Sequence, residues 1–263
     1  MIPFDFPYPI HPECIPPGDD TAGRYTISFA KDPGELDEVL RLRYQVFNLE
    51  MGEGLETSRI TQRDLDPFDP TFHHLLIRDN DTGQVVGTYR MQTLEMARMG
   101  RGFYSAGEFD LSALPKHIQD QSVEIGRACI ASDHRNGRVL FLLWRGLMRY
   151  LKFNEKRYLF GCCSITSQDP EEGLVVFDHL RKNNWLRDDF VIKAQPGYTC
   201  EVAPQTLHMF PTPKIPRLMR IYLSYHAKMC SEPAIDREFK TIDFLALIDI
   251  QDFDEKMARN IGE

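Results

Sequence analysis

The stretch SVEIGRACIASDHRNGRVLFLLWRGLMRYLKF, residues 122–153, decides the fold of this chain. Its first part, up to residue 132, is a mainly apolar run that predicts a buried strand. SDHRNG, residues 132–137, predicts a turn, and residues 138–153 carry apolar side chains at the spacing of a helix. We therefore expect a strand, a tight turn and a helix in direct succession.

The segments on both sides of this unit alternate between strands and helices. On the N-terminal side we expect a strand at 25–30, a helix that begins after the N-cap Asp32, and a hairpin of strands 73–79 and 84–92. On the C-terminal side we expect strands at 157–166, 189–194, 198–203 and 241–250, helices at 171–183 and 215–229, and an acidic helix at the end. Residues 94–121 show no regular pattern.

The first 23 residues carry prolines at positions 3, 7, 9, 12, 16 and 17. This composition predicts an extended N-terminal arm, either packed over the surface or disordered. We therefore expect the folded domain to span residues 24–263.

Charged residues stand inside segments that should otherwise only pack. They are Arg43, Asp66, Asp69, Arg90, Glu124 and Arg127. Because an unpaired charge is costly to bury, these side chains must pair with each other or with a substrate. Three cations and three anions balance without any metal, so the set is either a polar pocket for a zwitterion or a structural ion network that ties a loop to the sheet.

Composition excludes several classes of function. With 42% hydrophobic and 27% charged residues, the chain is typical of soluble globular proteins, and its net charge of −8 argues against nucleic acid as the main partner. The six cysteines lack the paired spacing of a zinc site, so we expect no metal and reduced thiols in a cytoplasm.

No apolar run approaches the roughly 18 residues that span a bilayer, so any membrane contact should be peripheral, at the inner face. The helix expected at 215–229 is basic and amphipathic, which suits either a lipid surface or a core helix with snorkelling cations.

The charge is unevenly distributed along the chain. From His134 to Arg157 there are seven Lys or Arg residues and one Glu. Such a basic segment in an acidic protein suits an acidic partner or a phosphate, although a solvated helix face explains it equally well.

The order of the expected elements resembles the GNAT acyltransferase fold. This resemblance implies an α/β fold, a single domain with a central twisted mixed β-sheet flanked by helices. In that fold the pantetheine arm of an acyl thioester lies along the strand at 122–132, and its phosphate sits on the following turn, where free N–H groups and the helix dipole favour anions. The implied donor-binding residues are Ala128, Cys129, Ile130, Arg135, Gly137 and Arg138.

SDHRNGRV departs from the Q/RxxGxG/A loop of that family, since Val139 occupies its last position. The full loop grips the pyrophosphate of coenzyme A. The departure therefore favours the phosphopantetheine of an acyl carrier protein, which has one phosphate, over coenzyme A.

Four short motifs carry a closer resemblance: RYQVF, DPFD, GTYR and EIGR, in that order. They resemble the acyl-homoserine lactone synthases and the related enzymes that move long acyl chains from acyl carrier protein to amino acids. The tail from Pro216 to Asp249 is similar to that of the ornithine lipid N-acyltransferases and of the proteins called haemolysins that are grouped with them. The lactone synthases place a Trp shortly after RYxVF, but no Trp precedes Trp144 here, so the ornithine branch is favoured over an S-adenosylmethionine acceptor.

The resemblance also implies roles for single residues. Glu124 and Arg127 match the acid and the arginine of the donor strand and are the expected catalytic pair. The expected substrate-binding residues are Arg43, Phe47, Asp66, Asp69 and Arg90. Within the basic segment, we expect Arg145, Arg149 and Lys152 to dock the carrier protein.

The chemistry of an amine acceptor agrees with these roles. An amine with a pKa of about 8 or higher is mostly protonated at neutral pH, so a base must take its proton before it attacks a thioester. Glu124 is the candidate base, acting through a water because a neighbouring Arg127 would keep it ionised. The N–H groups of Ala128 and Cys129 would bind the oxyanion if the strand is bulged there.

We therefore expect an acyl carrier protein-dependent N-acyltransferase that joins a long acyl or 3-hydroxyacyl chain to the amine of an amino acid, ornithine above all. No tightly bound cofactor is expected; the donor is an acyl-phosphopantetheine thioester, with acyl-coenzyme A as the second option. The alternatives are a coenzyme A-dependent GNAT enzyme that acts on another amine, a homoserine-lactone-type signal synthase, and a non-catalytic module that binds acyl chains or carrier protein.

Overall fold

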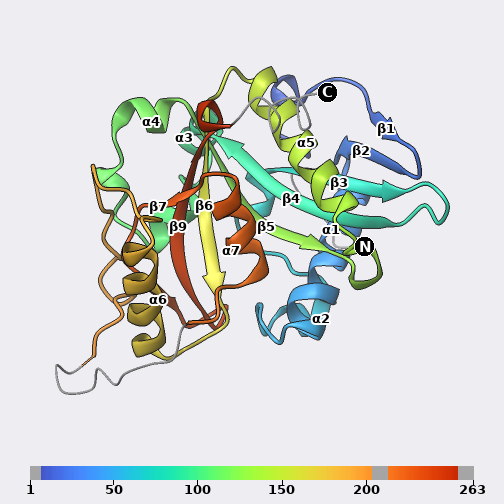
Figure 1. Cartoon of the computed structure of the whole chain (residues 1–263). Coiled ribbons are helices and arrows are strands. Elements are labelled where there is room, and N and C mark those ends of the chain that lie inside the picture. The colour runs from blue at the N-terminus through green and yellow to red at the C-terminus, as the bar shows by residue number, and fades with distance from the viewer. Residues whose placement is uncertain (1–6, 203–212, 254–263) are drawn as a thin grey trace. The chain divides into compact units, whose positions relative to one another are not determined.

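The computed structural model describes residues 7–202 and 213–253 (Figure 1). The chain falls into two compact units, the first comprising residues 7–102 and Val123–Arg157, the second Phe103–Ser122 and Tyr158–Phe253. Each unit has a sheet with helices packed on it, which confirms the α/β class. The domain limits of 24–263 stay a prediction, and the acidic helix expected at the end lies outside the described residues.

The first unit is built on an antiparallel sheet. Its strands are β1 (Asp20–Ala22), β2 (Tyr25–Phe29), β3 (His73–Asp79), β4 (Val85–Thr93) and β5 (Ser122–Ile130). They pair in sequence order, and each neighbouring pair is antiparallel. The hairpin predicted from the alternating pattern is the β3–β4 pair.

Two helices cover opposite faces of this sheet. In α5 (Arg138–Phe153), Gly146 packs so closely on Leu75 that an added Cβ would lie 2.5 Å from a Leu75 methyl carbon. The next residue of β3, Leu76, instead belongs to the apolar cluster of α1 (Pro33–Arg43). Because neighbouring strand residues point to opposite faces, α1 and α5 lie on different sides of β3. Figure 1 labels both helices and the strands. A strand covered on both faces reads as a continuous apolar run.

The start of α1 follows from its sequence. The Asp32 side chain accepts hydrogen bonds from the N–H groups of Gly34 and Glu35 and so caps the helix, and Pro33 takes the first helical position. The predicted helix does not stay α-helical, however. Tyr44–Glu50 form a π-helix, whose wider turns re-aim the side chain of Phe47.

The described part of the N-terminal arm packs on the first unit, which was one of the two expectations for it. Asp20–Ala22 pair with β2, and Tyr8 is buried in the apolar cluster of α1. Residues 1–6 of the predicted arm lie outside the described part of the chain.

The second unit has a sheet centred on β9 (Thr241–Asp249). This strand pairs antiparallel with β6 (Tyr158–Ile165), β7 (Lys228–Met229) and β8 (Ala234–Asp236). Single parallel bridges join Leu186 to Met229 and Ile192 to Ser231, so pairs of both directions occur. The helix α6 (Pro170–Lys182) packs on β8, and α7 (Arg217–Ser224) packs on β6.

Several predicted elements differ from the structure. The strands expected at 189–194 and 198–203 form only isolated bridges at Ile192, Ala194 and Thr199. The helix expected at 215–229 ends at Ser224, because Lys228–Met229 pair with β9 instead. Residues 94–121, expected to be irregular, contain α3 (Leu94–Met99) and α4 (Lys116–Asp120), and a further short helix, α2, covers Ser58–Thr61. Tertiary pairing overrides a local pattern most easily in segments as short as these.

Among the described residues, no helix is both long and apolar enough to cross a membrane.

Candidate active site

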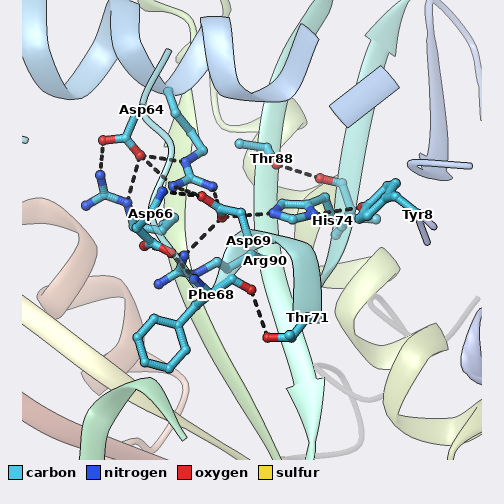
Figure 2. A network of polar contacts seen from close by, with 12 residues as sticks. Tyr8, Asp64, Asp66, Phe68, Asp69, Thr71, His74, Thr88 and Arg90 are labelled. Atoms are coloured by element: carbon cyan, nitrogen blue, oxygen red, sulfur yellow. Dashed lines mark hydrogen bonds and ion pairs between the residues drawn. The ribbon is translucent and has the colours of Figure 1, made fainter. Parts of the chain in front are cut away.

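Asp69 is the centre of a buried ion network in the first unit (Figure 2). Its carboxylate accepts hydrogen bonds from Arg43 at 2.6 Å and from Arg90 at 3.0 Å, and it faces His74 Nε2 at 3.2 Å. None of the Asp69 side chain is exposed. We use the term ion network for the side chains of Arg43, Asp64, Asp66, Asp69, His74, Arg90 and Arg127.

The acidic members come from one loop that is folded by its own carboxylates. Asp69 Oδ2 accepts a hydrogen bond from the N–H of Asp66 at 2.8 Å, and Asp66 Oδ1 accepts one from the N–H of Phe68 at 2.8 Å. The N–H of Asp64 donates to the Leu40 carbonyl, which ties the loop to α1. The predicted acidic pair is thus part of a turn that closes on itself.

The cationic members come from three different elements. Arg43 ends α1, and its Nε donates to Asp64 at 2.8 Å. Arg90, on β4, donates to Asp66 at 2.5 Å and lies over the Phe72 ring at 4.7 Å. Arg127, on β5, pairs with Asp64.

The guanidinium of Arg127 stacks on the Phe47 ring, with 4.4 Å between Cζ and the ring centroid. Phe47, a residue of the π-helix, therefore contacts Arg127 of β5. Asp64 is an ion-pair partner of Arg127.

Electrostatics keep Asp69 and Asp64 ionised. Burial by itself raises the pKa of Asp69, but Arg43 and Arg90 outweigh it and hold this pKa well below its usual range. For Asp64, Arg127 and Arg43 likewise outweigh burial and lower the pKa. Buried charges in this arrangement are stable only as a complete set, since removal of one member leaves another unpaired.

Of the two neighbouring histidines on β3, His74 contacts the ion network and His73 contacts residues outside it. His74 Nε2 faces Asp69, and its Nδ1 lies 2.8 Å from the Tyr8 hydroxyl, an arrangement that Figure 2 shows. His73 Nε2 lies 2.7 Å from the Ile10 carbonyl, and its Nδ1 lies 2.8 Å from the Tyr150 hydroxyl. Both are fully buried, because β3 is covered on both faces. Each ring has one acceptor and one hydroxyl as partners and suits the neutral form.

His73 alone is expected to lower the free energy of unfolding by about 3 kcal/mol as the pH is lowered from about 6.5 to 4. Burial lowers the pKa of His73 to about 4. Between these pH values the unfolded chain binds a proton that the folded protein excludes, so stability is lost as the pH falls. Urea unfolding at a series of pH values measures the slope, and His73→Gln should flatten it. Equal slopes for the two proteins would contradict this assignment.

Glu124 lies on β5 directly opposite Gln92 on β4. Gln92 Nε2 donates to Glu124 Oε2 at 2.8 Å and to the Gly102 carbonyl at 3.0 Å. Both amide hydrogens are therefore used, which fixes the orientation of the amide. Gln92 Oε1 is buried and has no hydrogen-bond partner among the described residues, so a donor is missing at this place beside Glu124.

The strand β5 carries a bulge at Arg127 and Ala128. Thr88 pairs with Cys129 and Arg90 with Gly126, so Arg127 and Ala128 together oppose Tyr89. Arg127 has a φ of 48°, a left-handed conformation that is rare for a side chain of this size. The condition under which the N–H groups of Ala128 and Cys129 could serve an oxyanion is thus met. Ile130 is half-buried at the end of the strand, and burial raises the pKa of the Cys129 thiol to about 12, so this cysteine is not a nucleophile.

The turn after β5 has the expected geometry. Gly137, with a φ of 85°, is the N-cap of α5, and only glycine adopts this conformation without strain. Arg135 pairs with Glu50 at 2.5 Å and also donates to the Ile130 carbonyl. Arg138 is exposed and donates to the Ala22 carbonyl, while its own N–H is capped by Asn136.

Two of the three expected docking residues face the N-terminal arm. Arg145 pairs with Asp20 at 2.8 Å, and Arg149 donates to the carbonyls of Pro17 and Gly18. Lys152 is exposed on the same helix. Part of the positive charge of α5 therefore holds the arm.

Sequence reasoning missed four residues of this site: Tyr8, Asp64, His74 and Gln92. Asp64 is the first residue of the DLDPFD run, and Gln92 follows Arg90 by two positions, so alternation alone places Gln92 on the face of Arg90. The pairing of Arg127 with Asp64 joins residues that are far apart in the sequence, and no local pattern reports it.

Known proteins similar to this chain identify its family. The sequence profile of the acetyltransferase (GNAT) domain matches residues 42–145. An L-ornithine N(alpha)-acyltransferase of Rhizobium meliloti (strain 1021) is 30% identical over 254 residues, which cover 89% of this chain and 84% of that protein. One of Brucella abortus (strain 2308) is 30% identical over 245 residues, covering 87% and 85%.

Solved structures similar to this chain include the acyl-homoserine lactone synthase LasI, with 15% identity, a TM-score of 0.48, and coverage of 93% of this chain and 95% of that one. FeeM, an N-acyl amino acid synthase from uncultured soil microbes, has 10% identity and a TM-score of 0.46, covering 87% and 92%. The sequence relatives, at this identity and over this length, settle the question: the chain belongs to the family of the L-ornithine N(alpha)-acyltransferases.

Proposed function

We propose that this chain transfers a long acyl chain from a phosphopantetheine thioester to the α-amine of ornithine. Membership of the family makes it an N-acyltransferase that acts on the amine of an amino acid. The observation that carries the finer proposal is the buried Glu124 on β5. Its carboxylate accepts a hydrogen bond from Gln92 on β4, and the bulge of β5 begins three residues after it.

Glu124 takes the proton of the acceptor ammonium, directly or through a water. Gln92 is a positioning residue: it fixes the Glu124 carboxylate and offers its Oε1 to an N–H of the acceptor. The neutral amine attacks the thioester carbonyl carbon, a C–N bond forms, and the oxyanion is stabilised by the N–H groups of Ala128 and Cys129. The intermediate collapses with cleavage of the C–S bond, the attacking nitrogen loses its second proton and becomes the amide, and the leaving thiolate takes up that proton. Glu124 returns its own proton to solvent.

The role of the ion network changes from the one expected. Asp69 is fully buried and is bound to Arg43, Arg90 and His74, so we propose that it supports the site and does not touch the acceptor. Asp66, also bound to Arg90, belongs to the same support. Arg127 of the network, and Phe47 that stacks on it, remain candidates for contact with substrate, because the Arg127 side chain keeps 13% of its surface exposed.

The proposed acceptor is tested with a panel of amino acids offered to the purified protein together with a long-chain acyl carrier protein. Ornithine should be acylated faster than neutral amino acids of similar length, because those lack its second ammonium. Uniform rates across the panel, or activity with S-adenosylmethionine alone, would reject ornithine and leave only the N-acyltransferase class.

We also propose that the donor is an acyl carrier protein. The turn at Gly137 carries Arg135 and Arg138, enough charge for one phosphate, and α5 continues from it with the exposed Lys152. Peripheral contact of α7 with anionic lipid is a separate proposal, which has less support than the carrier-protein donor. Met219 and Tyr222 of that helix are buried, so much of its apolar side packs inside the protein.

Lys152→Glu is expected to raise KM for acyl carrier protein about threefold to tenfold and to weaken its salt dependence, while the kinetics with acyl-coenzyme A stay unchanged. Lys116→Glu, at another exposed lysine, is the matched control. Steady-state kinetics with both donors at several salt concentrations provide the measurement. An equal effect of Lys152→Glu on both donors would show that this lysine contributes to stability and not to docking.

A further inference from the structure

The helix α5 carries four of its cations on one face. Arg138, Arg145, Arg149 and Lys152 follow each other by seven, four and three positions. With 3.6 residues per turn, this spacing places all four within an arc of about 60° around the helix axis. We call these four residues the basic stripe. It begins at the turn that the proposed function assigns to the donor phosphate and runs from there along α5.

The N-terminal arm runs along the basic stripe in the opposite direction. Later stripe residues contact earlier arm residues, and every one of these contacts lies within the first unit. In order along α5, Arg138 donates to the Ala22 carbonyl at 3.2 Å, Arg145 pairs with Asp20 at 2.8 Å, and Arg149 donates to the carbonyls of Pro17 and Gly18.

The arm offers the basic stripe the chemistry of an acidic partner. From residue 7 to residue 23 it has three carboxylates, those of Glu13, Asp19 and Asp20, and no Lys or Arg. An acidic protein that approached α5 would therefore be attracted by the stripe and repelled by the arm that lies on it. The arm also leaves the stripe incompletely satisfied, since Arg149 Nη1 is buried and has no hydrogen-bond partner among the described residues.

Residues Pro17–Asp20, which we call the strap, link two anchored parts of the arm. Before the strap, the Cys14 carbonyl accepts a hydrogen bond from Asn154 at 2.9 Å. After it, β1 pairs with β2. The strap itself is exposed from Pro17 to Asp19.

The backbone of the strap suits a segment that can leave the helix. Pro17 has no N–H and so makes no backbone donor bond, and Gly18 has a φ of 76°, which only glycine adopts without strain. The Arg145 and Asp20 side chains of the connecting ion pair keep 28% and 23% of their surfaces exposed. Such a pair is weak and is screened by salt, so a partner with its own carboxylates can replace Asp20.

We propose that the strap closes the basic stripe and that an acidic acyl carrier protein displaces it in order to dock on Arg145 and Arg149. This inference rests on the proposed carrier-protein donor, since it assigns how access to that donor's docking surface is controlled. The exposed Lys152 lies beyond the strap and makes the first contact. Opening of the strap then adds two arginines to the interface, and the affinity for the carrier protein is reduced by the fraction of molecules in which the strap is closed.

The first test is a calorimetric titration of the full chain with holo acyl carrier protein that carries no acyl chain, at low salt and without acceptor. Asp20→Asn should lower Kd about twofold to fivefold, because Arg145 loses the carboxylate that competes with the partner. Asp19→Asn is the matched control. It removes the same charge one residue earlier, but Asp19 pairs with Lys31 outside α5, so Kd should stay unchanged.

The second test uses the wild-type protein and so does not depend on the folding of a variant. Amide hydrogen exchange at Gly18, Asp19 and Asp20, measured by mass spectrometry, should become faster when carrier protein is added, because the strap leaves α5. Slower exchange would show that the partner binds over a strap that stays in place, and unchanged exchange would show that it binds elsewhere. Either result overturns the inference.

The outcomes separate this inference from the proposed function. If long-chain acyl carrier protein serves as donor but Asp20→Asn binds it no more tightly than Asp19→Asn, the inference is wrong and the function stands. If only acyl-coenzyme A serves as donor, the carrier-protein proposal fails, and the titration still decides the inference. Tighter binding of carrier protein by Asp20→Asn than by wild type then supports it, and absence of binding in both proteins refutes it.

Discussion

Glu124→Gln is expected to lower kcat for acyl transfer about a hundredfold or more, while the protein stays folded. The amide keeps the shape of the carboxylate and can still be held by Gln92, but it cannot accept the proton of the acceptor ammonium. The measurement is the steady-state rate of product formation with saturating donor and acceptor, accompanied by a thermal unfolding curve.

Two further variants make the result for Glu124 specific. Glu95→Gln, at an exposed glutamate that pairs with Lys156 on the surface, should leave kcat unchanged. Gln92→Leu should lower kcat about tenfold with a smaller change in KM, because Glu124 loses the partner that orients it. Acylation by Glu124→Gln at nearly the wild-type rate would remove Glu124 from the mechanism.

Asp69→Asn is expected to lower the free energy of unfolding by about 3–5 kcal/mol. The substitution keeps the volume of the side chain but leaves Arg43 and Arg90, both almost fully buried, without their shared counter-charge. Denaturant unfolding at neutral pH gives the value.

A surface aspartate provides the matched control for Asp69. Asp81 is 69% exposed and pairs with Arg24, so Asp81→Asn should cost less than about 1 kcal/mol. If the two variants lost equally little stability, the ion network would not be a structural support. The role of Asp69 as an acceptor-binding residue, which the sequence had implied, would then return.

Local patterns predicted the elements that matter most for the site. Apolar spacing placed the helix at 138–153, which are the limits of α5, and the alternation around NDTG predicted the β3–β4 hairpin. A turn was expected at 132–137, and the φ of 85° at Gly137 shows why its last residue is glycine. Each of these features is determined within a few residues, which is why the sequence reports it.

Features that depend on distant contacts could not be predicted in the same way. The π-helix at Tyr44–Glu50 changes which way Phe47 points, and nothing in RYQVF distinguishes it from an α-helical turn. The Lys228–Met229 strand was assigned to a helix because its pairing with β9 is a tertiary contact. Only the register of β6 and β9 shows that Asp243 lies opposite Ser164.

The charged residues illustrate both cases. Their burial was correctly inferred from the apolar segments around them, and the fully buried Arg43, Arg90 and Asp69 confirm it. Which partner each would take was not inferable, because every pair joins separate elements. Arg127 pairs with Asp64 and stacks on Phe47, and Glu124 is held by a neutral amide.

The most direct test of the account is a mass-spectrometric analysis of the product that the purified protein forms from a long-chain acyl carrier protein and ornithine. Ornithine labelled with nitrogen-15 at the α-amine allows the acylated nitrogen to be located by fragmentation. The account predicts a single product, acylated at the α-nitrogen, which Glu124→Gln forms at about one hundredth of the wild-type rate or less. Acylation at the side-chain amine, or release of free fatty acid without any acylated ornithine, would contradict it.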